Sequence, residues 1–201
     1  MSERIGAVIL AGGRSSRMGE DKAALLLDGQ TLLQRTILTV SQLTTSVTVV
    51  GSPPPESATA NCRIIPDNYP GEGPLGGILT GFSCSGERMR LVLACDMPLL
   101  SCELLELLIS SFDGVSDAVV PQRGDYLEGL CALYSKSAVN KLQGFFDSGG
   151  RSIHRGLKQL NVQVISEEVW RDAADTPDVM SSANTPNEFE RLKQIFVKTR
   201  L

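Results

Sequence analysis

Residues 5–22, IGAVILAGGRSSRMGEDK, begin with a short apolar run, Ile5 to Leu10, that stops at Ala11 and a pair of glycines. A run that is short, β-branched and closed by glycine is typical of a buried strand. In open α/β sheets the loop after such a strand is where ligands bind. Its small residues let backbone N–H groups face phosphate oxygens, while Arg17 and Lys22 add positive charge. The stretch therefore predicts a strand followed by a nucleoside triphosphate site.

This loop is not one of the common phosphate loops. A Walker A motif requires G-x-x-x-x-G-K-[ST], whereas Gly13 and Gly19 are spaced more widely and Glu20 and Asp21 precede Lys22. The G-x-G-x-x-G pattern of a dinucleotide-binding loop is also missing from the sequence. A glycine turn with solvated charges is the alternative to a phosphate site.

Size and charge narrow the class of protein. We expect one domain over residues 1–201, because a chain of 201 residues is long enough to bury one sizeable core. The formal net charge of −4 and the pI of about 5.1 argue against a duplex nucleic-acid binder. An anionic ligand must then be held by a local cluster of cations.

The cysteines and the apolar segments indicate the cellular compartment of the protein. The five cysteines are scattered without a C-x-x-C pair, which disfavours a zinc site and favours reduced thiols. No apolar stretch approaches the roughly 20 residues of a membrane span. The N-terminal apolar run is too short for a signal peptide. We expect a cytoplasmic protein that contacts no membrane.

Strand and helix patterns alternate along the chain. Thr31 is expected to cap a helix with a buried stripe from Leu32 to Leu43, and a strand follows at Ser46 to Val50. Such a strand–helix–strand unit indicates a partly parallel sheet. The sequence therefore predicts an α/β fold, a three-layer α/β/α sandwich around a mostly parallel, Rossmann-like sheet. Further strands are expected at residues 63–65, 91–94, 118–120, 129–134 and 162–165, and further helices after Ser101, Ser135 and Thr185. Residues 166–182 have no assignment.

An aspartate follows the apolar run Leu91 to Ala94, in the sequence Cys95-Asp96-Met97-Pro98. A carboxylate at the carboxyl end of a buried strand lies on the ligand-binding edge of the sheet. Mg²⁺ takes one or two carboxylates together with substrate phosphates. Asp96 is thus the best candidate for a metal ligand, and an aspartate that caps a turn before Pro98 is the alternative.

A second glycine-rich loop, PDNYPGEGPLGG, spans Pro66 to Gly77, and a helix is expected to begin at Ile78. Its density of glycine and proline is equally consistent with a plain connection. Farther along, Arg151, His154, Arg155 and Lys158 form a basic cluster at a predicted helix start that could hold an anion. A solvated basic face is the alternative there.

The amino-acid sequences of these loops resemble those of one protein family. LAGGRSSRMGEDK matches the signature L-A-[GA]-G-x-S-x-R-M-G-x-x-K of nucleotidyltransferases of the GT-A-like fold. With Gly12 and Asp21-Lys22 it looks most like the molybdenum cofactor guanylyltransferases. The resemblance implies transfer of GMP from GTP to the terminal phosphate of molybdopterin, with Mg²⁺ and release of pyrophosphate. It also implies a cytoplasmic enzyme in transient contact with proteins of molybdoenzyme maturation, while the oligomeric state stays open.

The resemblance also assigns roles to residues of this chain. Arg17, Lys22 and Asp96 are expected to be catalytic, with Asp96 as the metal ligand. The residues expected to bind the nucleotide are Leu10, Ala11, Gly12, Gly13, Lys22, Asp67, Gly73, Leu75 and Asp96. Arg151 and Ser152, in the family's G-x-R-S-[IL] segment, and Asn184, in its terminal N-T-P motif, are expected to bind the acceptor.

The chain departs from the family pattern at several positions. Glu128-Gly129 stands where a His-Pro pair is usual, Ser182 replaces an asparagine that borders the acceptor, and Gly51 replaces an asparagine that touches the nucleotide. These departures keep two alternatives open. One is a related nucleotidyltransferase that uses CTP or a sugar-phosphate acceptor, and the other is a non-catalytic nucleotide-binding module.

Overall fold

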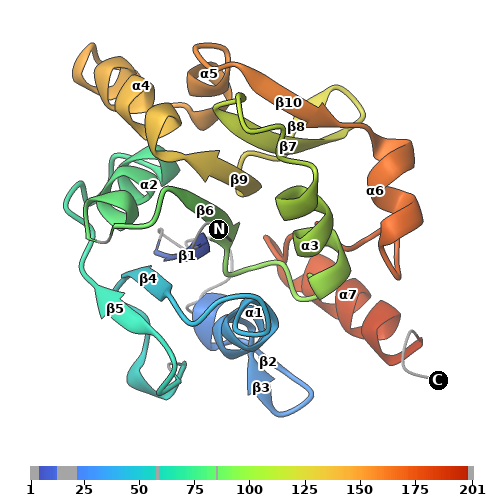
Figure 1. The fold of residues 1–201 in the computed structure, drawn as a ribbon. Helices are drawn as coiled ribbons and strands as arrows, with labels where there is room; N and C mark the ends of the chain where they lie inside the picture. The colour runs from blue at the N-terminus through green and yellow to red at the C-terminus, as the bar shows by residue number, and fades with distance from the viewer. Residues whose placement is uncertain (1–4, 13–21, 58, 85, 199–201) are drawn as a thin grey trace.

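The computed structural model describes residues 5–12, 22–57, 59–84 and 86–198, and Figure 1 shows their arrangement. An eight-stranded sheet forms the centre, in the order β10-β7-β9-β6-β1-β4-β5 with β8 paired to β7. Its strands are β1 (Ile5–Ala11), β4 (Val47–Gly51), β5 (Arg63–Ile65), β6 (Met89–Ala94), β7 (Ala118–Arg123), β8 (Tyr126–Leu127), β9 (Cys131–Ser135) and β10 (Val162–Ile165). A small separate hairpin joins β2 (Leu26–Leu27) to β3 (Gln30–Thr31).

Helices cover both faces of this sheet (Figure 1). The α-helices are α1 (Leu32–Val40), α2 (Pro74–Ser83), α3 (Cys102–Ser110), α4 (Lys136–Asp147), α5 (Ile153–Leu157), α6 (Glu167–Ala173) and α7 (Pro186–Lys198). Two short 3-10 helices are η1 (Lys22–Ala24) and η2 (Pro55–Ser57).

The sheet is mostly parallel, which confirms the predicted fold class. Strand β1 pairs in parallel with β4 on one side and with β6 on the other, and β10 pairs in parallel with β7. Strand β9 is antiparallel to both of its neighbours, β6 and β7. Because β6 and β7 are each antiparallel to β9, they run in the same direction, and their carboxyl ends reach the same edge of the sheet.

The alternation of side chains along β1 builds a core on each face. Ala7 and Ile9 pack into a cluster with residues of α1, α3 and α6, whereas Val8 packs into a cluster with residues of α2, α4 and α5. Successive side chains of a strand point to opposite faces, so a fully apolar strand must be covered on both sides. The predicted three-layer arrangement is confirmed.

The predicted helix caps are confirmed as well. The hydroxyl oxygen of Thr31 accepts a hydrogen bond from the N–H of Gln34 at 3.1 Å, which completes a capping box. The hydroxyl oxygens of Ser101 and Ser135 accept from the N–H of Leu104 and of Ala138 at the starts of α3 and α4. The hydroxyl of Thr185 accepts from the N–H of Glu188 at 3.2 Å at the start of α7.

Helix α2 begins at Pro74, four residues before the predicted start at Ile78. Gly73, with φ of 80°, turns the chain into the helix, and proline is well suited to the first helical position because no N–H is needed there. The second half of the glycine-rich loop is therefore the first turn of a helix. The prediction failed because glycine and proline were taken as signals of a loop.

The glycines of α2 bring this helix close to β1. A Cβ atom at Gly81 would lie 2.4 Å from Cγ1 of Val8, and one at Gly77 would lie 3.0 Å from Cδ2 of Leu10. Neither position can take a larger residue without displacing a strand side chain. Small residues in the helix thus set the distance between α2 and β1.

Strand boundaries also differ from prediction, most clearly in β7 and β9. Strand β7 continues through Pro121 to Arg123, because the carbonyl of Pro121 accepts from the N–H of Glu128 at 2.9 Å and the chain turns back as β8. Strand β9 begins at Cys131 rather than at Gly129. The unassigned segment holds α6, where the buried Trp170 donates to the carbonyl of Gln122 at 2.8 Å.

Over the described part of the chain, we find no helix with both the length and the apolar character that crossing a membrane requires.

Candidate active site

Three residues that were predicted to be functional meet at the carboxyl edge of the sheet. The ammonium group of Lys22, in η1, donates to Oδ2 of Asp96 at 2.7 Å and to Oδ1 of Asn184 at 2.6 Å. Asp96 follows β6, and Asn184 precedes α7. The side chains of Lys22 and Asp96 are only 21% and 15% exposed, so this ion pair is partly withdrawn from water.

The backbone fixes Asn184 at this place. The N–H of Ala183 donates to the carbonyl of Asp96 at 2.9 Å, which ties the start of α7 to the end of β6. The N–H of Asn184 donates to the carboxylate of Glu188 at 3.0 Å. The N-T-P motif therefore positions one amide side chain and starts a helix at the same time.

A lysine ammonium carries three N–H donors. Two of them are used by Asp96 and Asn184. Among the described residues the ammonium has no third partner, so an incoming anion can take that place, and the neighbouring carboxylate orients the lysine. Two partners hold the ammonium in one position. This geometry suits an oxyanion that carries several negative charges, because a lysine without fixed partners would be held too loosely to place it precisely.

Gly51, one of the departures from the family pattern, is enforced by packing. It ends β4 opposite Ala11 with φ of 133°, and a Cβ atom there would lie 2.1 Å from the carbonyl oxygen of Ala11. In this backbone no side chain can stand at the position. Ala11 is buried and Gly12 is exposed, so the chain reaches the surface at the point where the phosphate loop begins.

The second glycine-rich segment is held by its own aspartate. Oδ1 of Asp67 accepts from the N–H of Tyr69 at 2.9 Å and from the hydroxyl of Thr80 at 2.9 Å. A side chain that bonds the backbone two residues on is a common turn device. Asp67 thus shapes this loop against α2.

Leu75 and Leu10, both expected to bind the nucleotide, sit differently in the fold. Leu75 lies in the first turn of α2 and is completely buried in the core. Leu10 is partly buried against the same core, and its carbonyl accepts from the N–H of Cys95 at 3.3 Å. The side chain of Leu75 therefore packs in the core under the glycine-rich loop Pro66 to Gly77. Leu10 is only partly buried, and Gly73 lies on the exposed side of that loop.

Arg151 and Ser152, both expected to bind the acceptor, make local contacts. The guanidinium of Arg151 donates to the carboxylate of Glu72 and to the carbonyl of Phe146, and it lies 4.0 Å from the centre of the Phe146 ring. The hydroxyl of Ser152 caps α5. The contact with Glu72 links the nucleotide loop to the segment before α5, and only Asn184 of the three expected acceptor residues touches Lys22.

Arg17 and Gly13 lie outside the described residues, and their expected roles stay predictions from the sequence. Neither the Lys22–Asn184 contact nor the Arg151–Glu72 contact was foreseen. The only signal in the sequence was that both partners in each pair lie beside glycine- or proline-rich turns.

The described residues contain no group of three or more His, Cys, Asp or Glu side chains arranged to hold a metal ion by themselves. A single hard carboxylate, Asp96, stands at the strand end. That donor set does not suit a structural zinc site, but it fits Mg²⁺ brought in with substrate phosphates.

A thiol lies near this edge but is not activated. Burial raises the pKa of the Cys131 thiol above its ordinary value, and the charge of Glu128 raises it further. Only the thiolate is a good nucleophile. Cys131 therefore stays a neutral core residue of β9.

Comparison with known proteins adds the family. A sequence profile described as the MobA-like NTP transferase domain matches residues 7–164. A molybdenum cofactor guanylyltransferase of Desulfosudis oleivorans is 31% identical over 192 residues, with 94% of this chain and 94% of that protein covered. One of Vibrio atlanticus is 32% identical over 183 residues, with 90% and 91% covered.

Solved structures give the same result. The crystal structure of the molybdopterin-guanine dinucleotide biosynthesis protein A from Archaeoglobus fulgidus matches with a TM-score of 0.82 and 27% identity, and 96% of this chain and 99% of that chain are covered. Its match extends over nearly all of the architecture described above. With a family profile over most of its length and relatives above 30% identity, this chain belongs to the MobA-like NTP transferase family.

Proposed function

We propose that this protein transfers GMP from GTP to the terminal phosphate of molybdopterin and releases pyrophosphate. The observation that carries the proposal is the placement of Lys22 between Asp96 and Asn184 at the carboxyl edge of the parallel sheet. The names of the related guanylyltransferases and of the similar solved structure supply the substrates.

The reaction joins two anions. An oxygen of the acceptor phosphate attacks the α-phosphorus of GTP, a new phosphorus–oxygen bond forms, and the bond between the α-phosphorus and the bridging oxygen breaks. The electron pair leaves with pyrophosphate. The acceptor oxygen is already deprotonated at neutral pH, so the protein must orient the reactants and neutralise charge, without a general base.

Each residue of the site has a part in that task. Lys22 donates its third N–H to a phosphate oxygen and neutralises charge that grows on the leaving group. Asn184 holds the ammonium in place from the acceptor side. Arg17 adds a second cation on the phosphate loop, as the sequence predicts. The backbone of Leu10, Ala11, Gly12 and Gly13, with Asp67, Gly73 and Leu75, shapes the nucleotide side.

Asp96 would hold Mg²⁺, which when bound neutralises phosphate charge and orders the phosphate oxygens. The carboxylate can accept the ammonium of Lys22 on one oxygen and present the other to a cation. Arg151 and Ser152 form the acceptor side with Asn184. The enzyme would fold as one unit over residues 1–201. It would work in the cytoplasm, where its nucleotide substrate is found, and would make transient contact with proteins that mature molybdoenzymes.

Pyrophosphate release tests the proposal. The purified protein is mixed with GTP, CTP or ATP, each with molybdopterin or a sugar phosphate, and with or without Mg²⁺. We expect release only with GTP, molybdopterin and Mg²⁺ together. Preference for CTP would overturn the guanylyl assignment, release with a sugar phosphate would overturn the acceptor, and nucleotide binding without any release would leave a binding module.

A further inference from the structure

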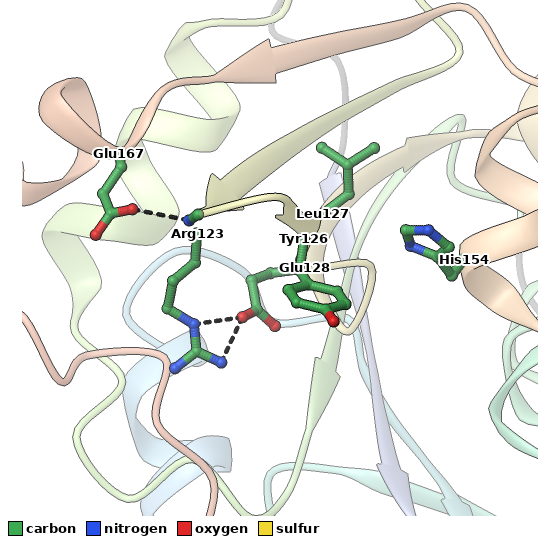
Figure 2. A pocket seen from close by; sticks show the side chains of 7 residues that line it. Arg123, Tyr126, Leu127, Glu128, His154 and Glu167 are labelled. Carbon is green, nitrogen blue, oxygen red and sulfur yellow. Dashed lines mark hydrogen bonds and ion pairs between the residues drawn. The ribbon is translucent and has the colours of Figure 1, made fainter.

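A polar pocket lies on the same edge of the sheet as Lys22 and Asp96. It has a volume of about 690 Å³ and is lined by Arg123, Gly124, Tyr126, Leu127, Glu128, His154 and Glu167 (Figure 2). Strands β6 and β7 run in the same direction with β9 between them, and neighbouring strands are about 4.8 Å apart. The end of β7 is therefore roughly 10 Å from the end of β6, close enough for one elongated substrate to reach both.

Two hydrogen bonds hold the hairpin that lines this pocket. The N–H of Gly124 donates to the carboxylate of Glu167 at 2.8 Å, and the indole of Trp170 donates to the carbonyl of Gln122 at 2.8 Å. Both partners belong to α6. Hydrogen bonds from Gly124 and Arg171 lower the pKa of the Glu167 carboxyl below its ordinary value, so this anchor stays ionised. The loop is thus a fixed surface rather than a loose turn.

Glu128 points into the pocket with one oxygen in use. The guanidinium of Arg123 contacts Oε1 through Nε at 2.7 Å and through Nη2 at 2.6 Å (Figure 2). Within the described part of the chain, Oε2 has no hydrogen-bond partner, and the side chain is 17% exposed. An ionised carboxylate can accept about four hydrogen bonds. Arg123 therefore orients the Glu128 carboxylate, and Oε2 can still accept hydrogen bonds from a ligand in the pocket.

Two aromatic rings line the same pocket (Figure 2). Tyr126, on β8, is 71% exposed, and its ring centre lies 6.4 Å from that of His154 on α5. Helix α5 comes this close because Gly129 has no side chain: a Cβ atom there would lie 3.1 Å from Cγ1 of Ile153. An exposed aromatic beside an oriented carboxylate is a combination that recognises flat heterocycles with N–H donors.

We propose that this pocket binds the fused heteroaromatic ring of the acceptor, with Glu128 as the residue that determines its specificity. Oε2 of Glu128 accepts from the ring N–H and the exocyclic amine of a 2-amino-4-oxopyrimidine edge, and Tyr126 stacks on the ring face. This inference rests on the proposed function for the identity of the acceptor as a pterin. The inference gives a role to Glu128-Gly129, where the family usually has His-Pro. The glycine lets α5 pack close to this segment, and the glutamate accepts hydrogen bonds from the ring.

Guanine carries the same donor edge as a pterin, so the test must separate the two. The probe is unsubstituted pterin, whose fluorescence reports binding to the protein without turnover. Lumazine, which has an oxygen in place of the 2-amino group, is the matched ligand. GTP affinity, measured by calorimetry on the same variants, shows whether guanine uses this pocket instead.

We expect wild-type protein to bind the pterin and to bind lumazine at least about tenfold more weakly, because one charged hydrogen bond is lost. Glu128→Gln and Tyr126→Leu should each weaken pterin binding about tenfold or more and leave GTP binding unchanged. Glu168→Gln, on the exposed part of α6 and outside the pocket lining, is the control and should bind the pterin as the wild type does.

Other results would overturn the inference. Absence of pterin binding, equal affinity for pterin and lumazine, or unchanged affinity in Glu128→Gln would each do so. Weakened GTP binding in that variant would assign the pocket to guanine. Failure of the proposed function looks different: pterin binding that depends on Glu128 but no pyrophosphate release from GTP and molybdopterin would reject the reaction and keep the pocket.

Discussion

The Nζ atom of Lys22 lies 2.6 Å from Oδ1 of Asn184, although 162 positions separate the two residues in the chain. This contact completes the cluster, because it joins η1 to the start of α7. The same ammonium pairs with Asp96 at the end of β6. Three distant segments therefore converge on one positive charge, and several predictions test what that charge does.

Replacing Lys22 by alanine should lower the rate of pyrophosphate release at least about 10²-fold, on the scale of lost transition-state electrostatics. Lys22→Arg should recover only part of the rate, because a planar guanidinium cannot reproduce the ammonium geometry. Lys193→Ala, which removes a lysine paired with Glu190 on the exposed side of α7, is the control. A Lys22→Ala enzyme with near-normal turnover would remove Lys22 from the mechanism.

Asp96→Asn keeps the shape of the side chain and removes its charge. We expect turnover to fall at least about 10²-fold and the concentration of Mg²⁺ needed for half-maximal rate to rise, since a neutral amide is a poorer ligand for a hard cation. Initial rates over a Mg²⁺ titration measure both effects. An unchanged Mg²⁺ requirement would show that the cation is held elsewhere.

Asn184→Ala leaves the ammonium of Lys22 with one partner fewer. The rate should drop about tenfold, as expected for one hydrogen bond to a charged group, while binding of GTP by calorimetry stays within about twofold. Asn184→Asp should restore the orientation of Lys22 through a carboxylate but place a negative charge beside an anionic acceptor. A loss of GTP binding in Asn184→Ala would instead place this residue on the nucleotide side.

Gly51→Ala should destabilise the fold by about 3 kcal/mol or more, from overpacking together with backbone strain. The reason is the 2.1 Å approach of the new Cβ atom to the carbonyl oxygen of Ala11. Gly144→Ala in α4 is the matched control: its Cβ atom would meet nothing within 4 Å, so about 0.5–1 kcal/mol of stabilisation is expected. Chemical denaturation of both variants checks the pair, and equal effects would contradict the packing argument.

The carboxyl of Asp117 makes folding stability depend on pH. Burial raises its pKa, but hydrogen bonds from Lys141, Asn161 and Ser137 outweigh burial and hold the pKa below its ordinary value. The folded state thus favours the charged form. This contribution is present above the ordinary carboxyl pKa of about 3.9 and is lost as pH falls through the lower folded value.

Asp117→Asn should therefore cost about 1–3 kcal/mol at pH 7, because it leaves donors around a buried site without their charged acceptor. The difference from the wild type should shrink as the pH falls below about 4. Urea unfolding at several pH values measures this difference. A gap that stays constant down to acid pH would show that the charge of Asp117 contributes nothing.

Local signals in the sequence predicted much of this architecture. The caps at Thr31, Ser101 and Thr185 were predicted because a hydroxyl that satisfies a free helix N–H acts within one turn of chain. The place of Asp96 followed from the rule that parallel strands end at one edge. The start of α2 at Pro74 was missed because glycine and proline also begin helices, and only packing against β1 shows which role they have.

By itself, then, the sequence determined the alternation of strands and helices and the identity of the residues at the strand ends, since both depend on periodicity and short-range chemistry. The tertiary structure alone decided which of these residues meet. The contacts of Lys22 with Asn184, of Arg151 with Glu72 and of Arg123 with Glu128 depend on register between strands and on how the chain returns to the sheet. No local pattern encodes these distances, because they result from the packing of the whole core.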